Sequence, residues 1–287
     1  MDTFQPLRSL QFFSNFEKLF DKLKFNVPLM TFLEEMVKNN VIISGSSILY
    51  CLLGENSFGD LPPSDIDIYV PFTTSETCNS SYSVQPFEHF IYNSLTTEKA
   101  KESSYGCDYN LMNDVALVRT FSTPKLLDES KSRLQGFRNC SNDSNDREEY
   151  ELDIITVRKD PKEFISEVFD LSFCKVFFDG INVYGKDSLE DILSQKGTVD
   201  RLSVPCHSYN GDAVFINDCL KFCDYMRYDR LISVLSDSLA TYNIEDIWMR
   251  PAKYENDKVL ISLLKTITRV EKYIKRGFTI TYHGAKL

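Results

Sequence analysis

Two short apolar segments with acidic residues at alternate positions constrain the fold of this chain more than any other feature. They are DIDIYV at 65–70 and ELDIITV at 151–157, and both have the composition of β-strands. Side chains two residues apart in a strand point to the same face, so Asp65 and Asp67 share one face of the first strand. If the second strand pairs beside the first, Asp153 joins them and three carboxylates converge.

Two carboxylates so close together carry a cost. From the strand rise, the Cα atoms of Asp65 and Asp67 lie roughly 6.6 Å apart. At that distance two unit charges repel by roughly 2.5 kcal/mol at an effective dielectric of about 20, and burial adds a desolvation cost. A hard divalent cation offsets both, because Mg²⁺ prefers carboxylate oxygens and shares its remaining positions with water and substrate phosphates.

Three converging carboxylates suit two metal ions about 3.5–4 Å apart, either Mg²⁺ or Mn²⁺. Such a pair holds the attacking and leaving oxygens of an in-line phosphoryl displacement. We therefore predict that Asp65, Asp67 and Asp153 are both the metal ligands and the catalytic residues.

A glycine-serine turn upstream of these strands fits the same chemistry. VIIS (41–44) predicts a buried strand, and the apolar run that follows predicts a helix that starts at the serines and ends at Gly54. Glycine lets the backbone approach a phosphate closely, and the start of a helix directs N–H groups and a positive dipole end toward an anion. Gly45, Ser46 and Ser47 are therefore predicted to bind the phosphates of a nucleotide.

Each of these features alone also has a simpler structural interpretation. Gly-Ser-Ser before a helix is most often only a cap, and an Asp-x-Asp pair is compatible with the solvated face of an edge strand. Their combination, in this order along the chain, favours a functional site.

The overall composition excludes some classes of protein and leaves others open. A formal net charge of −10 argues against a protein that coats nucleic acid through a broad basic face. The first ten residues do not resemble a signal peptide, and no stretch approaches the roughly 18 apolar residues of a membrane span. Eight scattered cysteines suit reduced thiols, so we expect a cytoplasmic, reducing compartment and no membrane partner.

Two further groups of residues each allow two interpretations. The basic residues Arg269, Lys272, Lys275 and Arg276 either reach a triphosphate or RNA backbone or form the solvated end of a helix. A zinc site is one interpretation of Cys206, His207, Cys219 and Cys223. Buried structural cysteines are favoured, because adjacent Cys206 and His207 fit poorly in one tetrahedral site and Cys219 and Cys223 are spaced i, i+4 on an expected helix.

The order of the expected elements indicates an α/β (α+β) fold with a mixed sheet flanked by helices, followed by a mainly helical C-terminal region. With 287 residues and 43% hydrophobic residues, the chain can bury a sizeable core. We predict a catalytic domain at 1–186 and a helical domain at 187–287. Expected helices lie at 7–24, 27–38, 46–53, 86–95, 161–169, 187–195, 212–241 and 257–276; expected strands lie at 41–44, 65–70, 115–121, 150–157, 173–178, 181–185 and 277–284.

The motifs SGSS (44–47), SDIDIYV (64–70) and ELDIITV (151–157) resemble those of the polymerase-β-like nucleotidyltransferases. The resemblance implies transfer of a nucleoside monophosphate from a nucleoside triphosphate to a hydroxyl group, with two Mg²⁺ ions. It implies that Gly45 and Ser46 hold the triphosphate and that three carboxylates bind the metals, with Asp153 activating the acceptor hydroxyl. It also implies a helical domain after the catalytic one.

The segments ISGSSILYCLLGE (43–55), SDIDIYV (64–70) and FDLSFCKVFFDG (169–180) are also similar to nucleotidyltransferase-like proteins of fungi and large DNA viruses, a resemblance that covers roughly residues 41–185. The intervals from Gly45 to Asp65 and from Asp67 to Asp153 are longer than in many members of the superfamily. The sequence does not distinguish four kinds of acceptor: an RNA end, a protein hydroxyl, a second nucleotide and a small molecule. The first alternative is a protein of the same fold that has no catalytic activity and acts by binding a partner. The second is a structural or host-interaction protein whose aspartates are ordinary surface charges.

Overall fold

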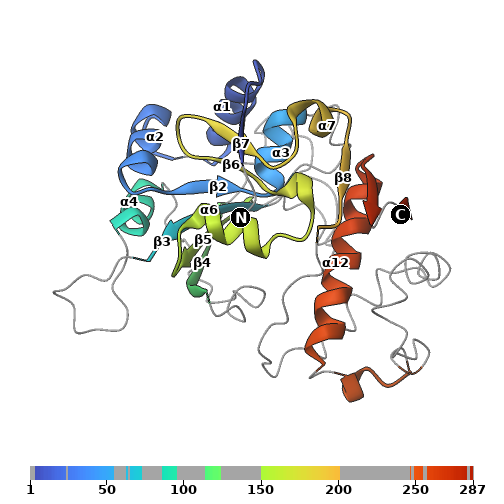
Figure 1. Cartoon of the computed structure of the whole chain (residues 1–287). Coiled ribbons are helices and arrows are strands. Elements are labelled where there is room, and N and C mark those ends of the chain that lie inside the picture. Colours follow the sequence, from blue (N-terminus) through green and yellow to red (C-terminus); the bar gives the residue numbers. More distant parts are fainter. Residues whose placement is uncertain are drawn as a thin grey trace, which may run out of the picture.

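The structure, a computed structural model, centres on a mixed seven-stranded sheet in the order β1-β7-β6-β2-β3-β5-β4 (Figure 1). It describes residues 4–23, 25–54, 63, 65–72, 86–95, 114–123, 150–200, 246, 249–254, 257–282 and 285–286. The strands of this sheet are β1 (Gln5–Leu7), β2 (Ile42–Ser44), β3 (Asp65–Pro71), β4 (Val115–Thr123), β5 (Tyr150–Val157), β6 (Val176–Phe178) and β7 (Val183–Gly185). The expected mixed sheet flanked by helices is confirmed.

Strand β3 lies between β2 and β5, and only its pairing with β5 is parallel among the described strand pairs of this sheet. Asp67 lies opposite Ser44 of β2 on one side and opposite Asp153 of β5 on the other. The two acidic strands therefore do pair, which was the condition for their carboxylates to converge, and the register places Asp67 and Asp153 directly side by side.

Helices cover both faces of the sheet because successive side chains along its strands point alternately into two apolar clusters, one on each face. The larger cluster joins residues such as Ile68 and Ile154 to the helices on one face, and the smaller one joins Tyr69 and Ile155 to Phe164 of α6 on the other. The helices are α1 (Phe12–Lys22), α2 (Leu29–Lys38), α3 (Ser46–Leu53) and α4 (Pro86–Ser94) on the first face, α6 (Pro161–Val168) on the second, and α7 (Leu189–Leu193) and α12 (Lys258–Lys275) toward the C-terminus (Figure 1).

A second, three-stranded sheet is built from the last third of the chain. It comprises β8 (Lys196–Thr198), β9 (Thr279–Tyr282) and β10 (Ala285–Lys286), with β9 in the centre. The expected strand at 277–284 is confirmed in β9. Strand β8 was not expected, because a three-residue polar segment has no periodicity and acquires its structure by pairing with β9.

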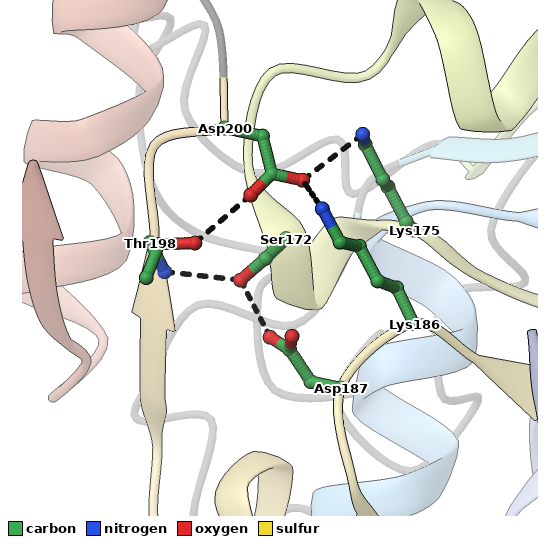
Figure 2. A network of polar contacts seen from close by, with 6 residues as sticks. All are labelled: Ser172, Lys175, Lys186, Asp187, Thr198 and Asp200. Atoms are coloured by element: carbon green, nitrogen blue, oxygen red, sulfur yellow. Dashed lines mark hydrogen bonds and ion pairs between the residues drawn. The ribbon is translucent and has the colours of Figure 1, made fainter. Parts of the chain in front are cut away.

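A polar network ties this small sheet to the main one (Figure 2). The Asp200 carboxylate accepts from Lys186 at 2.5 Å and forms an ion pair with buried Lys175 at 2.9 Å. The Ser172 hydroxyl donates to Asp187 and accepts from the backbone N–H of Thr198. These contacts cross residue 187, at which the predicted helical domain begins.

Helix α12 is also bound to the main body of the protein. Asp170, which is buried, accepts from Thr266 at 2.9 Å and from Arg269 at 2.7 Å, and both donors lie on α12. The larger apolar cluster likewise includes Ile267 of α12 together with Ile68 of β3. One hydrophobic core therefore extends across the predicted boundary, and the division into two domains stays a prediction.

Several expected boundaries are wrong for identifiable reasons. The first helix begins at Phe12 and not at residue 7, because Gln5–Leu7 pair with β7 as a strand and Leu10 is fully exposed. The strand expected at 173–178 is shortened to β6 by a 3₁₀ turn at Ser172–Cys174. The helix expected at 212–241 and the cysteine and histidine group at 206–223 lie outside the described residues.

Among the helices that the structure describes, none has the length and apolar character needed to cross a membrane.

The buried ion pair between α4 and β4 generates a prediction about stability. Glu88 is 1% exposed and binds Arg119 at 3.0 Å and Thr156 at 2.7 Å. Replacing Arg119 with Met should lower the free energy of unfolding, measured by urea denaturation, by about 3 kcal/mol, because the buried carboxylate loses its counter-charge. The double change Glu88→Leu/Arg119→Met should recover much of that loss.

The matched control is Lys38→Met, which breaks the Lys38–Glu35 ion pair at 2.8 Å on the surface of α2, where Lys38 is 70% exposed. It should cost less than about 1 kcal/mol. An Arg119→Met protein no less stable than Lys38→Met would contradict the prediction.

Candidate active site

A row of polar residues crosses four neighbouring strands on one face of the main sheet. In the order of the strands it runs Ser44, Asp67, Asp153 and Thr120, each directly opposite the next. Directly paired residues on neighbouring strands point to the same face, and adjacent strands lie about 4.8 Å apart. The structure therefore brings two of the three predicted carboxylates together, and Asp65 lies two residues from Asp67 on the same face.

The aspartates lie beyond the part of this face that α6 covers. Tyr69 and Ile155, two residues further along β3 and β5, are fully buried in the cluster that contains Phe164 of α6. Asp65, Asp67 and Asp153 are instead half-buried, and the intervening residues of β3 are buried on the opposite face. The alternation read from the sequence thus places the carboxylates at the partly open end of the sheet.

Gly45 provides the space in which the Asp67 side chain lies. Its backbone has φ +84° and ψ −151°, a conformation that is essentially restricted to glycine. A Cβ atom at this position would lie 3.0 Å from Asp67 Oδ2. The glycine therefore serves two purposes, since it allows the turn from β2 into α3 and leaves room beside a carboxylate oxygen.

The two serines of the turn have different environments. The Ser46 hydroxyl, which is half-buried, donates to Asp65 Oδ1 at 3.5 Å. Ser47 is buried and donates to the carbonyl of Ser44, the last residue of β2, at 3.4 Å. Ser46 is therefore close to the acidic group, and any contact of Ser47 with a ligand would come from its backbone N–H, which lies in the unbonded first turn of the helix.

The electrostatic environment of Asp153 disfavours its negative charge. Burial raises the pKa of its carboxyl above the ordinary value, and the negative charge of Asp65 raises it further. A hydrogen bond of 2.5 Å from the Thr120 hydroxyl to Asp153 Oδ1 opposes this rise in pKa but does not cancel it. The site therefore concentrates negative charge at a cost that a bound cation would relieve.

The C-terminal basic group divides into two kinds of residue. Lys272 and Lys275 are exposed, as expected for a solvated helix end. Arg269 binds buried Asp170, and Arg276 is buried with its guanidinium 5.3 Å from the centre of the Tyr273 ring. Burial lowers the pKa of Arg276, while the negative charge of Asp65 favours its charged form. The end of α12 therefore contributes positive charge near the acidic site.

The residues present fit a divalent metal ion. Mg²⁺ is usually held by one or two carboxylates together with water and substrate phosphates, and adjacent Asp67 and Asp153 supply that number. The space beside Asp67 Oδ2 is kept open by the absence of a side chain at Gly45. Within the described ranges, no group of three or more His, Cys, Asp or Glu side chains is already arranged as a metal site.

One residue of this site, Thr120, was not expected from the sequence, and for a second, Arg276, the sequence left two interpretations open. Thr120 lies in the expected strand at 115–121, but only the register of β4 against β5 shows that it faces Asp153. The sequence did not show that Arg276 is buried while Lys272 and Lys275 are exposed, because the basic residues of this group look alike in the sequence. Neither residue belongs to a sequence motif. The position of Thr120 depends on strand pairing, and the burial of Arg276 depends on tertiary contacts.

Comparison with protein families found no family model that matches this chain, and comparison with curated proteins found no match either.

The two glycines that flank α3 offer a direct test of the space beside Asp67. Gly45 and Gly54 have similar unusual backbones, but a Cβ at Gly54 would meet no atom closer than 3.7 Å. Replacing either glycine with alanine should cost about 1–3 kcal/mol of unfolding free energy. Only Gly45→Ala should also weaken Mn²⁺ binding, by more than about tenfold in a calorimetric titration. Equal Mn²⁺ affinity in the two variants would show that Gly45 serves the backbone alone.

The raised pKa of Asp153 predicts how an uncharged replacement changes stability. Because the folded state favours the protonated form, the wild-type protein loses stability as pH rises from the ordinary pKa of 3.8 through the raised value. Asp153→Asn removes this loss and can still accept from Thr120, so its melting temperature at pH 7 should exceed that of the wild type. The difference should shrink toward pH 4. Asp21→Asn on the surface of α1 is the control, and equal melting of Asp153→Asn and wild type at pH 7 would refute the prediction.

Proposed function

We propose that this chain is a metal-dependent nucleotidyltransferase of the polymerase-β-like superfamily, which transfers a nucleoside monophosphate from a nucleoside triphosphate to an acceptor hydroxyl. The observation that supports this most is the register of β3 and β5, which places Asp67 and Asp153 side by side with Asp65 on the same face. The start of α3, at Gly45 and Ser46, lies beside these carboxylates.

In this proposal each residue has one role. Asp65 and Asp67 would hold both metal ions, and Asp153 would hold the catalytic one. When bound, two Mg²⁺ ions supply Lewis acidity and neutralise charge on the phosphates. Gly45 and Ser46 bind the triphosphate through backbone N–H groups at the start of α3, where the helix dipole favours an anion.

The atoms and charges of the transfer step balance without a further reactant. The acceptor oxygen forms a bond to the α-phosphorus, the bond from this phosphorus to the bridging oxygen breaks, and pyrophosphate leaves. Asp153 receives the hydroxyl proton on its carboxylate. Its raised pKa, caused by burial and by Asp65, makes this carboxylate a stronger base than an ordinary aspartate.

Two features of the surroundings support an anionic substrate in a reducing compartment. Arg276 provides a buried positive charge that interacts with Asp65, which favours binding of a triphosphate. Cys51 and Cys174 are buried free thiols, which suits a cytoplasmic protein. The acceptor in this proposal is an RNA, a protein or a small molecule, and the reaction takes place away from membranes.

The proposal is tested by transfer of label. Purified protein is incubated with each α-³²P nucleoside triphosphate, with Mg²⁺ or Mn²⁺, and with total RNA or cell lysate. Asp65→Ala/Asp67→Ala should reduce transfer by about 100-fold or more, beyond the 10–100-fold typical of residues that only support metal ligands. Asp21→Ala, which removes a carboxylate from the surface of α1, should transfer label like the wild type.

The outcomes separate the proposal from its alternative. Transfer by the double variant at the wild-type rate would contradict the assigned roles of Asp65 and Asp67. Absence of transfer, together with absence of calorimetric binding of nucleotide and Mg²⁺ to the wild type, would favour a non-catalytic protein that acts through a partner. Thermal melting of the double variant shows whether it is folded, and the loss of charge repulsion should keep it at least as stable as the wild type.

A further inference from the structure

The third carboxylate of the site is held by a side chain from the edge strand β4. Thr120 is buried and lies directly opposite Asp153 in the antiparallel pairing of β4 with β5. Its hydroxyl donates to Asp153 Oδ1 at 2.5 Å, a short bond of the kind that a hydroxyl makes to a charged carboxylate. This contact joins two residues that are 33 positions apart in the sequence.

Strand β4 is well placed to hold this threonine in position. The neighbouring residue, Arg119, points to the opposite face of the sheet and binds Glu88 of α4 at 3.0 Å. Glu88 also accepts from Thr156 of β5 at 2.7 Å. On one face of the sheet, Thr120 of β4 therefore contacts Asp153 of β5 directly. On the other face, Glu88 links the two strands, because it binds both Arg119 of β4 and Thr156 of β5.

We infer that Thr120 is a positioning residue that orients the Asp153 carboxylate toward the metal and the acceptor. The inference rests on the proposed function, because it requires that Asp153 is a metal ligand. A hydroxyl donates a single hydrogen bond, so its bond to Oδ1 directs the second oxygen, Oδ2, to the ligand. Strand β4 lies next to β5 and not next to β3, so this contact reaches the aspartate of β5.

The geometry also explains why a threonine suits this position. Its β-branched side chain fits a strand, and its side chain has a single strongly restricted torsion between the backbone and the hydroxyl. A hydrogen bond from such a residue fixes both the torsion of the aspartate and the direction of its lone pairs. Outer partners of this kind typically contribute 10–100-fold to metal affinity or activity.

The experiment compares Thr120→Val, Thr120→Ser and Thr156→Val. Valine keeps the size and branching of threonine but cannot donate, whereas serine keeps the hydroxyl. Thr156→Val is the matched control, because it removes a similar hydroxyl–carboxylate bond from the opposite face of β5. Mn²⁺ affinity is measured by calorimetry in the presence of a nucleoside triphosphate, thermal melting reports stability, and label transfer reports activity.

Thr120→Val should bind Mn²⁺ about 10–100-fold more weakly than the wild type, and Thr120→Ser should stay within about threefold. Thr156→Val should melt at a lower temperature and keep wild-type Mn²⁺ affinity. Wild-type Mn²⁺ affinity in Thr120→Val, or an equal loss in Thr120→Ser, would overturn the inference while leaving the proposed function intact. A wild-type protein that binds no Mn²⁺ would overturn both.

Discussion

The parallel pairing of β3 with β5 is the interaction on which the rest of this structure depends. It places two acidic strands side by side in a sheet whose interior residues are fully buried, with Ile68 and Ile154 facing one set of helices and Tyr69 and Ile155 facing α6. A shift of one residue in either strand would exchange the two faces and bury a carboxylate in an apolar cluster. The apolar residues of both strands therefore enforce the register that brings the aspartates together.

The site that results is costly to the folded protein, and the surrounding elements reduce that cost only in part. Thr120 donates to Asp153, Ser46 donates to Asp65, and the end of α12 adds the positive charge of Arg276. The pKa of Asp153 is nevertheless raised, which means that the negative form is still disfavoured. An active site commonly stores such unfavourable charge for a ligand to neutralise, and a divalent ion with a triphosphate has the charge and the oxygen chemistry to do so.

The C-terminal part of the chain takes part in this arrangement. Helix α12 is attached through the buried contacts of Asp170, and the small sheet is attached through the Asp200 network that Figure 2 shows. Both attachments are polar and directional, whereas the apolar core beneath them is continuous. They fix the direction in which α12 approaches the main sheet, and this direction decides that Arg276 comes near Asp65.

The sequence by itself determined the elements whose signal is local. Alternation of apolar and acidic residues identified β3 and β5, and a glycine followed by serines and an apolar run identified the turn into α3. The shared face of Asp65 and Asp67 follows from the same local rules.

Only the tertiary structure decided which strands are neighbours and which side chains meet across them. Strands β1 and β8 are too short to have a periodic pattern, so they exist because β7 and β9 offer them hydrogen bonds. Thr120 gained its place beside Asp153 from the register of β4, and Arg276 was separated from the exposed lysines of α12 by burial. Pairing and burial are long-range interactions, and a pattern read along one segment contains no information about the segment that will lie against it.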